Sequence, residues 1–405
     1  MKQNYKIHTK ETTIRVLNTE VSAVRKKDII KKASRVIEND IIGISGSIGN
    51  GDDVQLFEEA KNNLSINIPY PYALETPRQE GIVIKENTVT HDNILSEVET
   101  VLDFLRTEYP EFDFSETAKI QEVITEFNDS NGTALAYEDS HIELGFILKD
   151  KALANLFDGY IAYEGRKFDA AKFIDQNRTI LDAYKKKLEM PDEKELPVMV
   201  VDQSVFHGKL LMEMNGEKLG AGSSLFSNKQ GEKLFNEKIT IYQDYNPRTA
   251  FRPFFDMEGV VNEDYEYTFV EKGIFKTGFT NKKVATDYNL AQTGSASGAF
   301  DDVPALGMTN VSIKVDTENL SDHVKKGIMV VIAAGGDYTP DGTYATPVQK
   351  AFLYENGEIK GCLPEFQLKS HLYDMLGKDY IGTFRSPFYM GDNQVITVCK
   401  MMIDK

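Results

Sequence analysis

The stretch that decides the fold class is Ala351-Phe-Leu-Tyr-Glu-Asn-Gly-Glu-Ile-Lys360. Its apolar run, the dipeptide Asn356-Gly357 and the short run that follows predict a β-hairpin, because Asn-Gly supplies the positive φ angles of a tight two-residue turn. A second hairpin is predicted around Lys272-Gly273, where aromatic residues alternate with polar ones before the turn. Uninterrupted apolar sequence from Ile328 to Ala333 predicts a buried central strand. The carboxyl-terminal half is therefore expected to be rich in strands.

Working outward from these hairpins, the pattern predicts both helices and strands. Val198 to Val201 predicts a strand that leads into a helix over 202–214. Asn39-Asp40 predicts a turn between two apolar stretches. Further helices are predicted over 54–64 (with Val54, Phe57, Ala60 and Leu64 on one stripe), 92–106 and 168–188, and further strands over 119–127, 133–137 and 142–148.

These elements predict an α+β protein of two domains. An amino-terminal mixed α/β domain is expected over 1–188, and a strand-rich domain with an antiparallel sheet or barrel-like form is expected over 196–405. The segment 185–197 is charged and contains two prolines, so it is the expected linker.

The charge and composition exclude several classes of protein. The chain has 405 residues and a formal net charge of −17, which repels phosphate backbones and argues against direct nucleic-acid binding. The best apolar run, Gly327 to Ala334, is far shorter than the roughly 20 residues of a membrane helix. The amino terminus lacks the apolar core of a secretory signal. Only Cys362 and Cys399 are present, so a reducing cytoplasm is the expected location.

Generic catalytic motifs do not match. The glycines of Gly46-Ser-Ile-Gly-Asn-Gly51 have the wrong order for a dinucleotide site, and the centre of Gly294-Ser-Ala-Ser-Gly298 is alanine and not a nucleophilic serine. The six histidines are never three to five residues apart, which excludes a helical His-x-x-x-His zinc pair. Residues alone therefore leave the purpose of the chain open.

Several stretches resemble the TldD/PmbA family, whose members are also called modulators of DNA gyrase or TldD/TldE-type peptidases. The stretches that carry the resemblance, in the family's order, are Phe255-Asp-Met-Glu-Gly259, Glu271-Lys-Gly-Ile-Phe-Lys-Thr-Gly278, Gln292-Thr-Gly-Ser-Ala296, Met308-Thr-Asn310 and Glu355-Asn-Gly-Glu-Ile-Lys-Gly361. The resemblance implies a peptidase-like fold over most of the chain.

Members of the TldD branch of that family carry His-Glu-x-x-x-His on the helix that corresponds to the one predicted here after the strand at 198–201. In those members the motif holds zinc together with a cysteine near the carboxyl terminus. Counting back without gaps from Ser224 places the first histidine on His207, the glutamate on Gly208 and the second histidine on Met212. The loop 382–391 contains no cysteine, and Cys399 lies beyond it in a predicted strand. A zinc hydrolase needs about three protein ligands, an open position for water and a base. The resemblance is therefore closer to the metal-free PmbA/TldE branch, and no metal or cofactor is expected, with zinc only in an intact TldD-type partner.

Seven residues are candidates for a site. The candidates for catalysis are His207 and Glu213, and those for binding are Asp256, Glu258, Gly294, Gly335 and Gly336. The alternatives are that the histidine packs at a helix start, that Glu213 is a solvated helix carboxylate, and that the others serve turns. Glycines in such loops also let a peptide backbone approach closely.

The expected function is that of a metal-free TldE-like subunit, which forms half of a peptide-binding groove and holds extended peptide along a sheet edge by main-chain hydrogen bonds. The expected partners are a second copy or a TldD-like subunit, together with unfolded or extended peptide, and neither nucleic acid nor membrane. One alternative is a self-sufficient hydrolase that uses His207 and Glu213. Another is a peptide-binding protein without catalytic activity.

Overall fold

The computed structural model describes residues 1–405 except 156, 202–203, 308–309, 317–318, 387 and 389–393. Strand outweighs helix, 44% against 20%, which confirms the predicted α+β class with a strand-rich carboxyl-terminal part. No helix among the described residues is long and apolar enough to cross a membrane.

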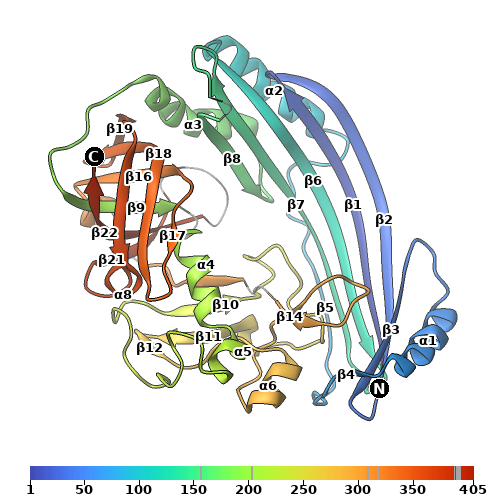
Figure 1. Cartoon of the computed structure of the whole chain (residues 1–405). Coiled ribbons are helices and arrows are strands. Elements are labelled where there is room, and N and C mark those ends of the chain that lie inside the picture. The colour runs from blue at the N-terminus through green and yellow to red at the C-terminus, as the bar shows by residue number, and fades with distance from the viewer. Residues whose placement is uncertain (156, 202–203, 308–309, 317–318, 387, 389–393) are drawn as a thin grey trace.

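The first sheet is built from very long strands and forms one side of the molecule (Figure 1). Its strand order is β4-β3-β2-β1-β6-β7-β5. Strand β5 pairs with the first part of β7, over 134–138, and β8 pairs with the later part of β7, over 142–148. The strands are β1 (Lys2–Leu17), β2 (Glu20–Glu38), β3 (Ile41–Ile48), β4 (Ile68–Pro69), β5 (Gln79–Val83), β6 (Phe112–Asp129), β7 (Ala134–Asp150) and β8 (Gly159–Gly165). The predicted turn at Asn39-Asp40 is confirmed, and both residues have positive φ, 53° and 57°.

Strand β7 corrects the prediction of two separate strands over 133–137 and 142–148. It runs without interruption through the polar stretch Glu138 to His141. The polar residues stay in the strand because their side chains are paired: Asp139 forms a buried ion pair with Arg166, 2.7 Å. Polarity here marks an internal contact and not a turn.

Helix α1 lies at one end of the first sheet and α2 and α3 lie at the other, while the remaining helices belong to the carboxyl-terminal part (Figure 1). The helices are α1 (Asp53–Asn62), α2 (Ile94–Glu108), α3 (Ala170–Lys185), α4 (Ser204–Glu213), α5 (Gly216–Gly220), α6 (Lys282–Tyr288), α7 (Leu320–His323) and α8 (Leu372–Met375), with 3₁₀ turns η1 (Asn63–Ile66) and η2 (Glu263–Tyr265). The helix predicted at 54–64 forms as α1 followed by η1, but its buried residues are Leu56 and Ala60, and Val54 is 72% exposed. The predicted stripe was therefore wrong in part, because the helix begins at the Asp52 cap and is rotated relative to that stripe.

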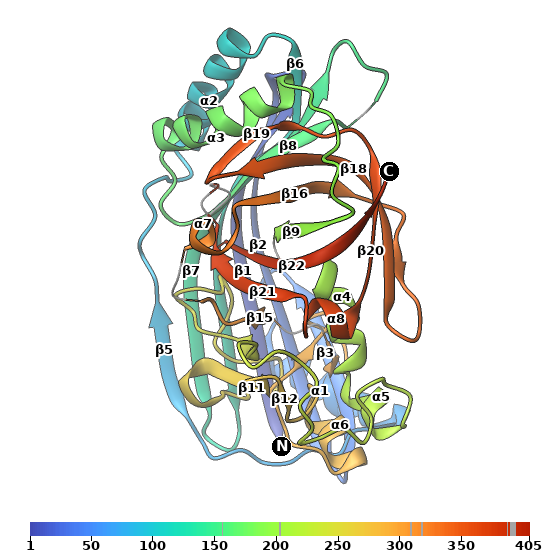
Figure 2. The same ribbon diagram turned by 90° about the vertical axis from the view of Figure 1, so that its left-hand side faces the viewer.

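The second large sheet closes into a five-stranded barrel. Strands β16, β9, β22, β20 and β18 are paired in that order, and β18 pairs back to β16. The strands are β9 (Glu195–Val201), β16 (Lys326–Ala333), β17 (Asp337–Tyr338), β18 (Thr343–Glu355), β19 (Glu358–Cys362), β20 (Phe366–His371), β21 (Tyr380–Arg385) and β22 (Val395–Asp404). Figure 2 shows these strands crossing in front of the long strands of the first sheet.

The predicted hairpins are confirmed. Asn356-Gly357 joins β18 to β19 with φ values of 52° and 90°. Lys272-Gly273 joins two strands of a smaller four-stranded sheet. The smaller sheets contain β10 (Ile241–Asp244), β11 (Glu266–Glu271), β12 (Ile274–Phe275) and β15 (Val311–Ile313), and the pair β13 (Ala296–Ser297) and β14 (Ala305–Leu306).

The largest apolar core is continuous from the first sheet to the barrel. It joins Phe114 and Phe146 of the first sheet with Phe352 and Ile396 of the barrel. The division into domains 1–188 and 196–405 stays a prediction. The arrangement that matters for a site is the packing of the barrel against the first sheet, with α4 packed on the barrel.

Candidate functional site

A pocket of about 470 Å³ lies between α4 and the barrel. It is lined by Tyr160, Val200, Val201, Val205, Gly208, Lys209, Met212, Val330, Val331, Ala333, Gly336, Asp337, Tyr338, Tyr344 and Thr346. Strand β9 ends at Val201 and α4 begins at Ser204, so a strand is followed by a helix as the sequence predicted, and residues of β9, α4 and β16 line the same pocket. Tyr160 of β8 brings the first sheet to the same pocket.

Helix α4 contributes a glycine and a methionine to the lining of this pocket. Gly208 and Met212 both line it, and no atom lies within 4 Å of where a Cβ of Gly208 would be. Met212 is 48% exposed. His207 is partly buried on the same helix but is not a lining residue.

Lys209 and Glu213 form a buried ion pair one turn apart on α4. Their Nζ and Oε1 atoms lie 2.8 Å apart, and the side chains are 4% and 6% exposed. Glu213 also accepts a hydrogen bond from the backbone N–H of Leu225, 2.6 Å, and Lys209 donates to the carbonyl of Thr339, 3.3 Å. The alternative of Glu213 as a solvated carboxylate is therefore wrong; its oxygens tie α4 to the loop that follows. The structure does not place it at the pocket, and its catalytic role stays a prediction.

The polar side-chain groups of the pocket are one ammonium group, one carboxylate, one aliphatic hydroxyl and three phenols. Lys209, Asp337, Thr346 and the tyrosines supply them, and the described lining contains neither histidine nor cysteine. The hydroxyl of Tyr338 is buried and has no hydrogen-bond partner among the described residues. Burial raises the pKa of Tyr338 and of Tyr344, so both hydroxyls stay protonated as donors at neutral pH. This set suits binding of polar backbone groups among apolar walls.

Asp256 lies away from the pocket and organises a buried loop. Its carboxylate accepts hydrogen bonds from the backbone N–H groups of Glu258 (2.9 Å), Val260 (3.0 Å) and Ala296 (2.9 Å). Burial raises the pKa of Asp256, and these three hydrogen bonds oppose the shift. The residue is the centre of a tight turn, as one of the two interpretations predicted.

Glu258 connects the same loop to the first sheet. Its carboxylate accepts hydrogen bonds from the hydroxyl of Tyr70 and from the backbone N–H of Lys282, the latter at 2.9 Å. Burial and then the charge of Asp256 raise the pKa of Glu258 to about 7. The two carboxylates are therefore brought together, but in an interior contact and not in the wall of the pocket.

Two fully buried cations face these carboxylates. Arg35 of β2 donates from Nη1 to the carbonyl of Met257, 2.5 Å, a contact that spans 222 residues. The Nζ of Lys282 lies 3.9 Å from the ring centroid of Tyr72 and 3.8 Å from Glu75. Burial lowers the pKa of both cations. This charge cluster joins the first sheet to the loop 255–260. The sequence indicated its two carboxylates but not the two cations, because Arg35 and Lys282 lie in other segments of the chain.

The three candidate glycines differ in position. Gly336 lines the pocket, and a Cβ on it would lie 2.3 Å from the carbonyl oxygen of Ala345. Gly335 precedes it with a φ of 87°. Gly294 has a φ of 67° and is held by Gln243, whose Nε2 donates to its carbonyl at 3.2 Å, away from the pocket. A binding role for any of them stays a prediction.

Comparison with known proteins defines the family. Residues 198–403 match the model of the PmbA/TldA metallopeptidase C-terminal domain. The chain belongs to the PmbA/TldA metallopeptidase family. Part of it is 30% identical over 160 residues to "Metalloprotease MJ0996" of Methanocaldococcus jannaschii, covering 38% of this chain and 35% of that protein. A "Zinc metalloprotease TldD homolog" of Saccharolobus solfataricus is 23% identical over 205 residues, covering 47% and 45%. The chain thus spans about a third to under a half of these curated relatives.

Solved structures of the PmbA/TldA type share the whole fold. TldE from Thermococcus kodakarensis superposes with a TM-score of 0.82 at 17% identity and covers 100% of this chain and 96% of that one. A putative modulator of a DNA gyrase from Thermotoga maritima superposes with a TM-score of 0.74 at 16% identity, covering 99% and 95%. At these identities the likeness shows the fold alone.

The stretches that carried the resemblance to the PmbA/TldA family meet in space. Met257 donates its backbone N–H to the carbonyl of Ala296, 3.2 Å, so the first and third stretches are directly bonded. The stretch Met308-Thr-Asn310 includes residues 308–309, which lie outside the described residues. Two of these family stretches therefore build the loop that docks onto the first sheet, and the pocket at α4 is a separate feature.

Proposed function

We propose that this chain is a metal-free, TldE-like subunit of a peptide-processing complex and that it forms half of a peptide-binding groove with a TldD-like partner. The observation that carries the proposal is the pocket at α4. Gly208 and Met212, which the gapless count matches to the glutamate and second histidine of the TldD motif, both line it. These two positions therefore supply neither the general base nor the second imidazole of the TldD motif, which supports a metal-free role for the pocket.

The remaining soft ligands also fit a metal-free pocket. Burial raises the pKa of the Cys399 thiol, which is fully buried, and raises that of Cys362 to about 11. A cysteine binds zinc as the thiolate, so these two thiols are poor ligands. One imidazole, that of His207, is too few for a catalytic zinc site, which takes about three protein ligands.

Peptide binding fits the wall of the pocket better than a small charged ligand does. The apolar walls come from β9 and β16, and the turn at Gly336 exposes backbone at the rim. An extended peptide can form main-chain hydrogen bonds there and place alternate side chains against the apolar walls. The two buried, unbonded cysteines support the further proposal of a cytoplasmic location.

The test is a peptidase assay on an unfolded peptide, with the chain alone, with a TldD-type homologue alone, and with both. We expect no cleavage by the chain alone and faster cleavage by the pair than by the homologue. Gly208→Leu should fill the pocket and return the pair to the rate of the homologue alone, while Gly208→Ala, which adds one methyl group in open space, should keep most of the gain.

The same assay separates the alternatives. Cleavage by the chain alone that is lost in His207→Ala and in Glu213→Gln would show a self-sufficient hydrolase. Binding of peptide without any gain in rate by the pair would show a binding protein without a part in the reaction. Either result would overturn the proposal.

A further inference from the structure

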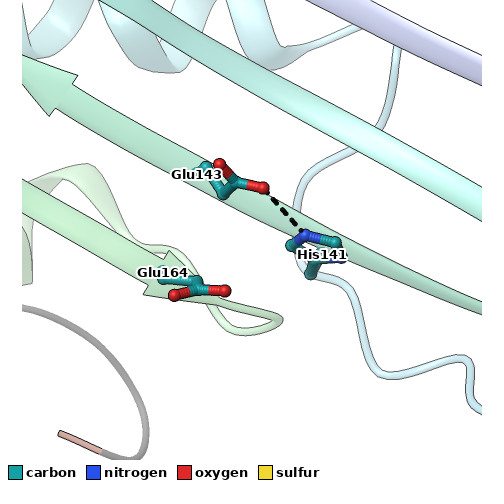
Figure 3. A group of neighbouring side chains, drawn as sticks. All are labelled: His141, Glu143 and Glu164. Carbon is teal, nitrogen blue, oxygen red and sulfur yellow. Dashed lines mark hydrogen bonds and ion pairs between the residues drawn. The ribbon is translucent and has the colours of Figure 1, made fainter. Parts of the chain in front are cut away.

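We propose a binding site for one divalent transition-metal ion, made by His141 and Glu143 of β7 and Glu164 of β8. Each residue offers one ligand atom, and the three atoms lie within 4.8 Å of one another (Figure 3). Among the described residues this is the one group in which three such ligands come together. The site uses none of the residues that line the pocket at α4, so it is independent of the proposed function.

The strands themselves create this group. Residues 141 and 143 of β7 lie on one face, because side chains alternate along a strand. The register of β7 against β8 places Glu164 directly opposite Glu143. Two carboxylates in directly opposed positions repel each other. A bound cation would convert this repulsion into attraction.

Lys119 contacts only one of the two oxygens of the Glu143 carboxylate. Lys119 of β6 lies 2.9 Å from Oε2 of Glu143, while Oε1 of the same carboxylate lies 3.1 Å from Nε2 of His141. The lysine therefore holds one oxygen and leaves the other turned toward the imidazole. A partner of this kind orients a ligating carboxylate.

The distances suit a small ion. In a tetrahedral zinc site with bonds of about 2.1 Å, neighbouring ligand atoms lie about 3.4 Å apart. The separation of 3.1 Å between His141 and Glu143 is close to this value, and small side-chain rotations bring in the third ligand. Glu164 is exposed, so an ion can enter from solvent and keep a water molecule in the open position.

The imidazole is held in place by an aromatic residue, Phe251. The ring of His141, which is 7% exposed, stacks on Phe251 at 5.2 Å between centroids and 21° between planes. Phe251 has a φ of 46°, a conformation that is rare for a bulky residue, and its ring also lies 4.5 Å from the guanidinium of Arg166. Because this side chain is already fixed by its packing, it loses little conformational entropy when it binds an ion.

The ligand set selects the class of ion. Two carboxylates and one imidazole suit zinc, manganese, iron or cobalt, whereas magnesium and calcium prefer oxygen ligands alone. Zinc is the appropriate probe because it accepts nitrogen and oxygen ligands in a four-coordinate site with one open position. Cobalt in the same site reports the coordination number in its visible spectrum.

The experiment is a calorimetric titration of the whole chain with Zn²⁺ after removal of metals by a chelator, with Co²⁺ spectra in parallel. We expect one ion per chain, and in Glu164→Gln and Glu143→Gln a weakening of about tenfold to a hundredfold, as for loss of a ligand or its support. Glu164 is exposed, so its variant keeps the fold, which circular dichroism checks.

Matched controls come from the chain itself. His8 and Asp28 form a histidine–carboxylate pair at 2.6 Å on the same sheet but belong to no group of three ligands among the described residues, so His8→Ala should bind as the parent does. His207→Ala should also leave binding unchanged, which separates this site from any metal at α4. Failure of the parent chain to take up Zn²⁺, or equal affinity in Glu164→Gln, would overturn the proposal. A failed peptidase assay would leave it untouched.

Discussion

Replacement of Gly259 by alanine should destabilise the chain through the loop that docks onto the first sheet. Gly259 has a φ of 73°, which costs an alanine about 1 kcal/mol. A Cβ there would lie 2.3 Å from Cε1 of Phe127 and within 2.8 Å of two further ring atoms. Phe127 is 1% exposed, so it has no solvent into which to move, and such overpacking typically costs about 1–3 kcal/mol. The expected loss is about 2–4 kcal/mol in the free energy of unfolding.

Gly357→Ala is the matched control for this loss. Gly357 also has positive φ, 90°, but nothing lies within 4 Å of its Cβ position. It should therefore show the backbone cost of about 1 kcal/mol without the overlap. The assay is urea unfolding followed by circular dichroism, with stabilities compared from midpoints at equal slope.

The difference between the two variants measures how tightly the loop packs on β6. Phe127→Leu in the Gly259→Ala background should recover part of the loss, since the smaller side chain makes room for the methyl group; a double-mutant cycle isolates this coupling. Equal losses in Gly259→Ala and Gly357→Ala, or no coupling to residue 127, would refute the reasoning that the ring blocks the Cβ.

Three further variants test the pocket wall and the buried charges. Gly208→Ala should raise stability by about 1 kcal/mol, because it replaces glycine within a helix where the Cβ meets nothing; a lower thermal midpoint would contradict this. Lys209→Met should cost about 3–5 kcal/mol by leaving Glu213 buried without its ion pair, and adding Glu213→Gln should restore part of it; no recovery would contradict the pairing. In the folded chain the pKa of Glu258 is raised from 4.5 to about 7. Between these values the folded state keeps a proton that the unfolded state releases, so the free energy of unfolding should fall by about 3 kcal/mol as pH rises from 4.5 to 7. Glu258→Gln should remove that part of the slope in urea titrations, and an unchanged slope would exclude the residue as its source.

Local chemistry made the hairpins and several helices predictable. The turn at Asn356-Gly357 depends on the φ preferences of two adjacent residues, and the structure has both at positive φ. The strand at 198–201 and the helix after it were likewise visible in the apolar pattern. The predicted stripe on α1 was wrong in part, because only Leu56 and Ala60 of the helix are buried. The elements that pack against a helix decide which of its faces is buried, and the helix's own sequence does not show them.

Contacts between distant segments could not be predicted in the same way. The polar run at 138–141 was interpreted as a break, because the sequence does not show that Arg166 pairs with Asp139. The buried charge cluster needs Arg35 to meet Met257 across 222 residues. A search for helical histidine pairs also missed the group on β7 and β8, since its spacing of two and its opposed partner are properties of strands and their register.

The two proposals depend on where side chains that can bind a metal ion are present and where they are absent. At α4, two positions that the family resemblance matches to the metal-site motif carry Gly208 and Met212, and both residues line the pocket. On β7 and β8, carboxylates that a strand pair would normally keep apart stand directly opposed beside an imidazole. Directly opposed carboxylates repel each other, and a cation bound between them would offset that repulsion. The physical argument for a metal is therefore stronger on the first sheet than at α4, and Zn²⁺ titration of Glu164→Gln beside His207→Ala decides between the two places.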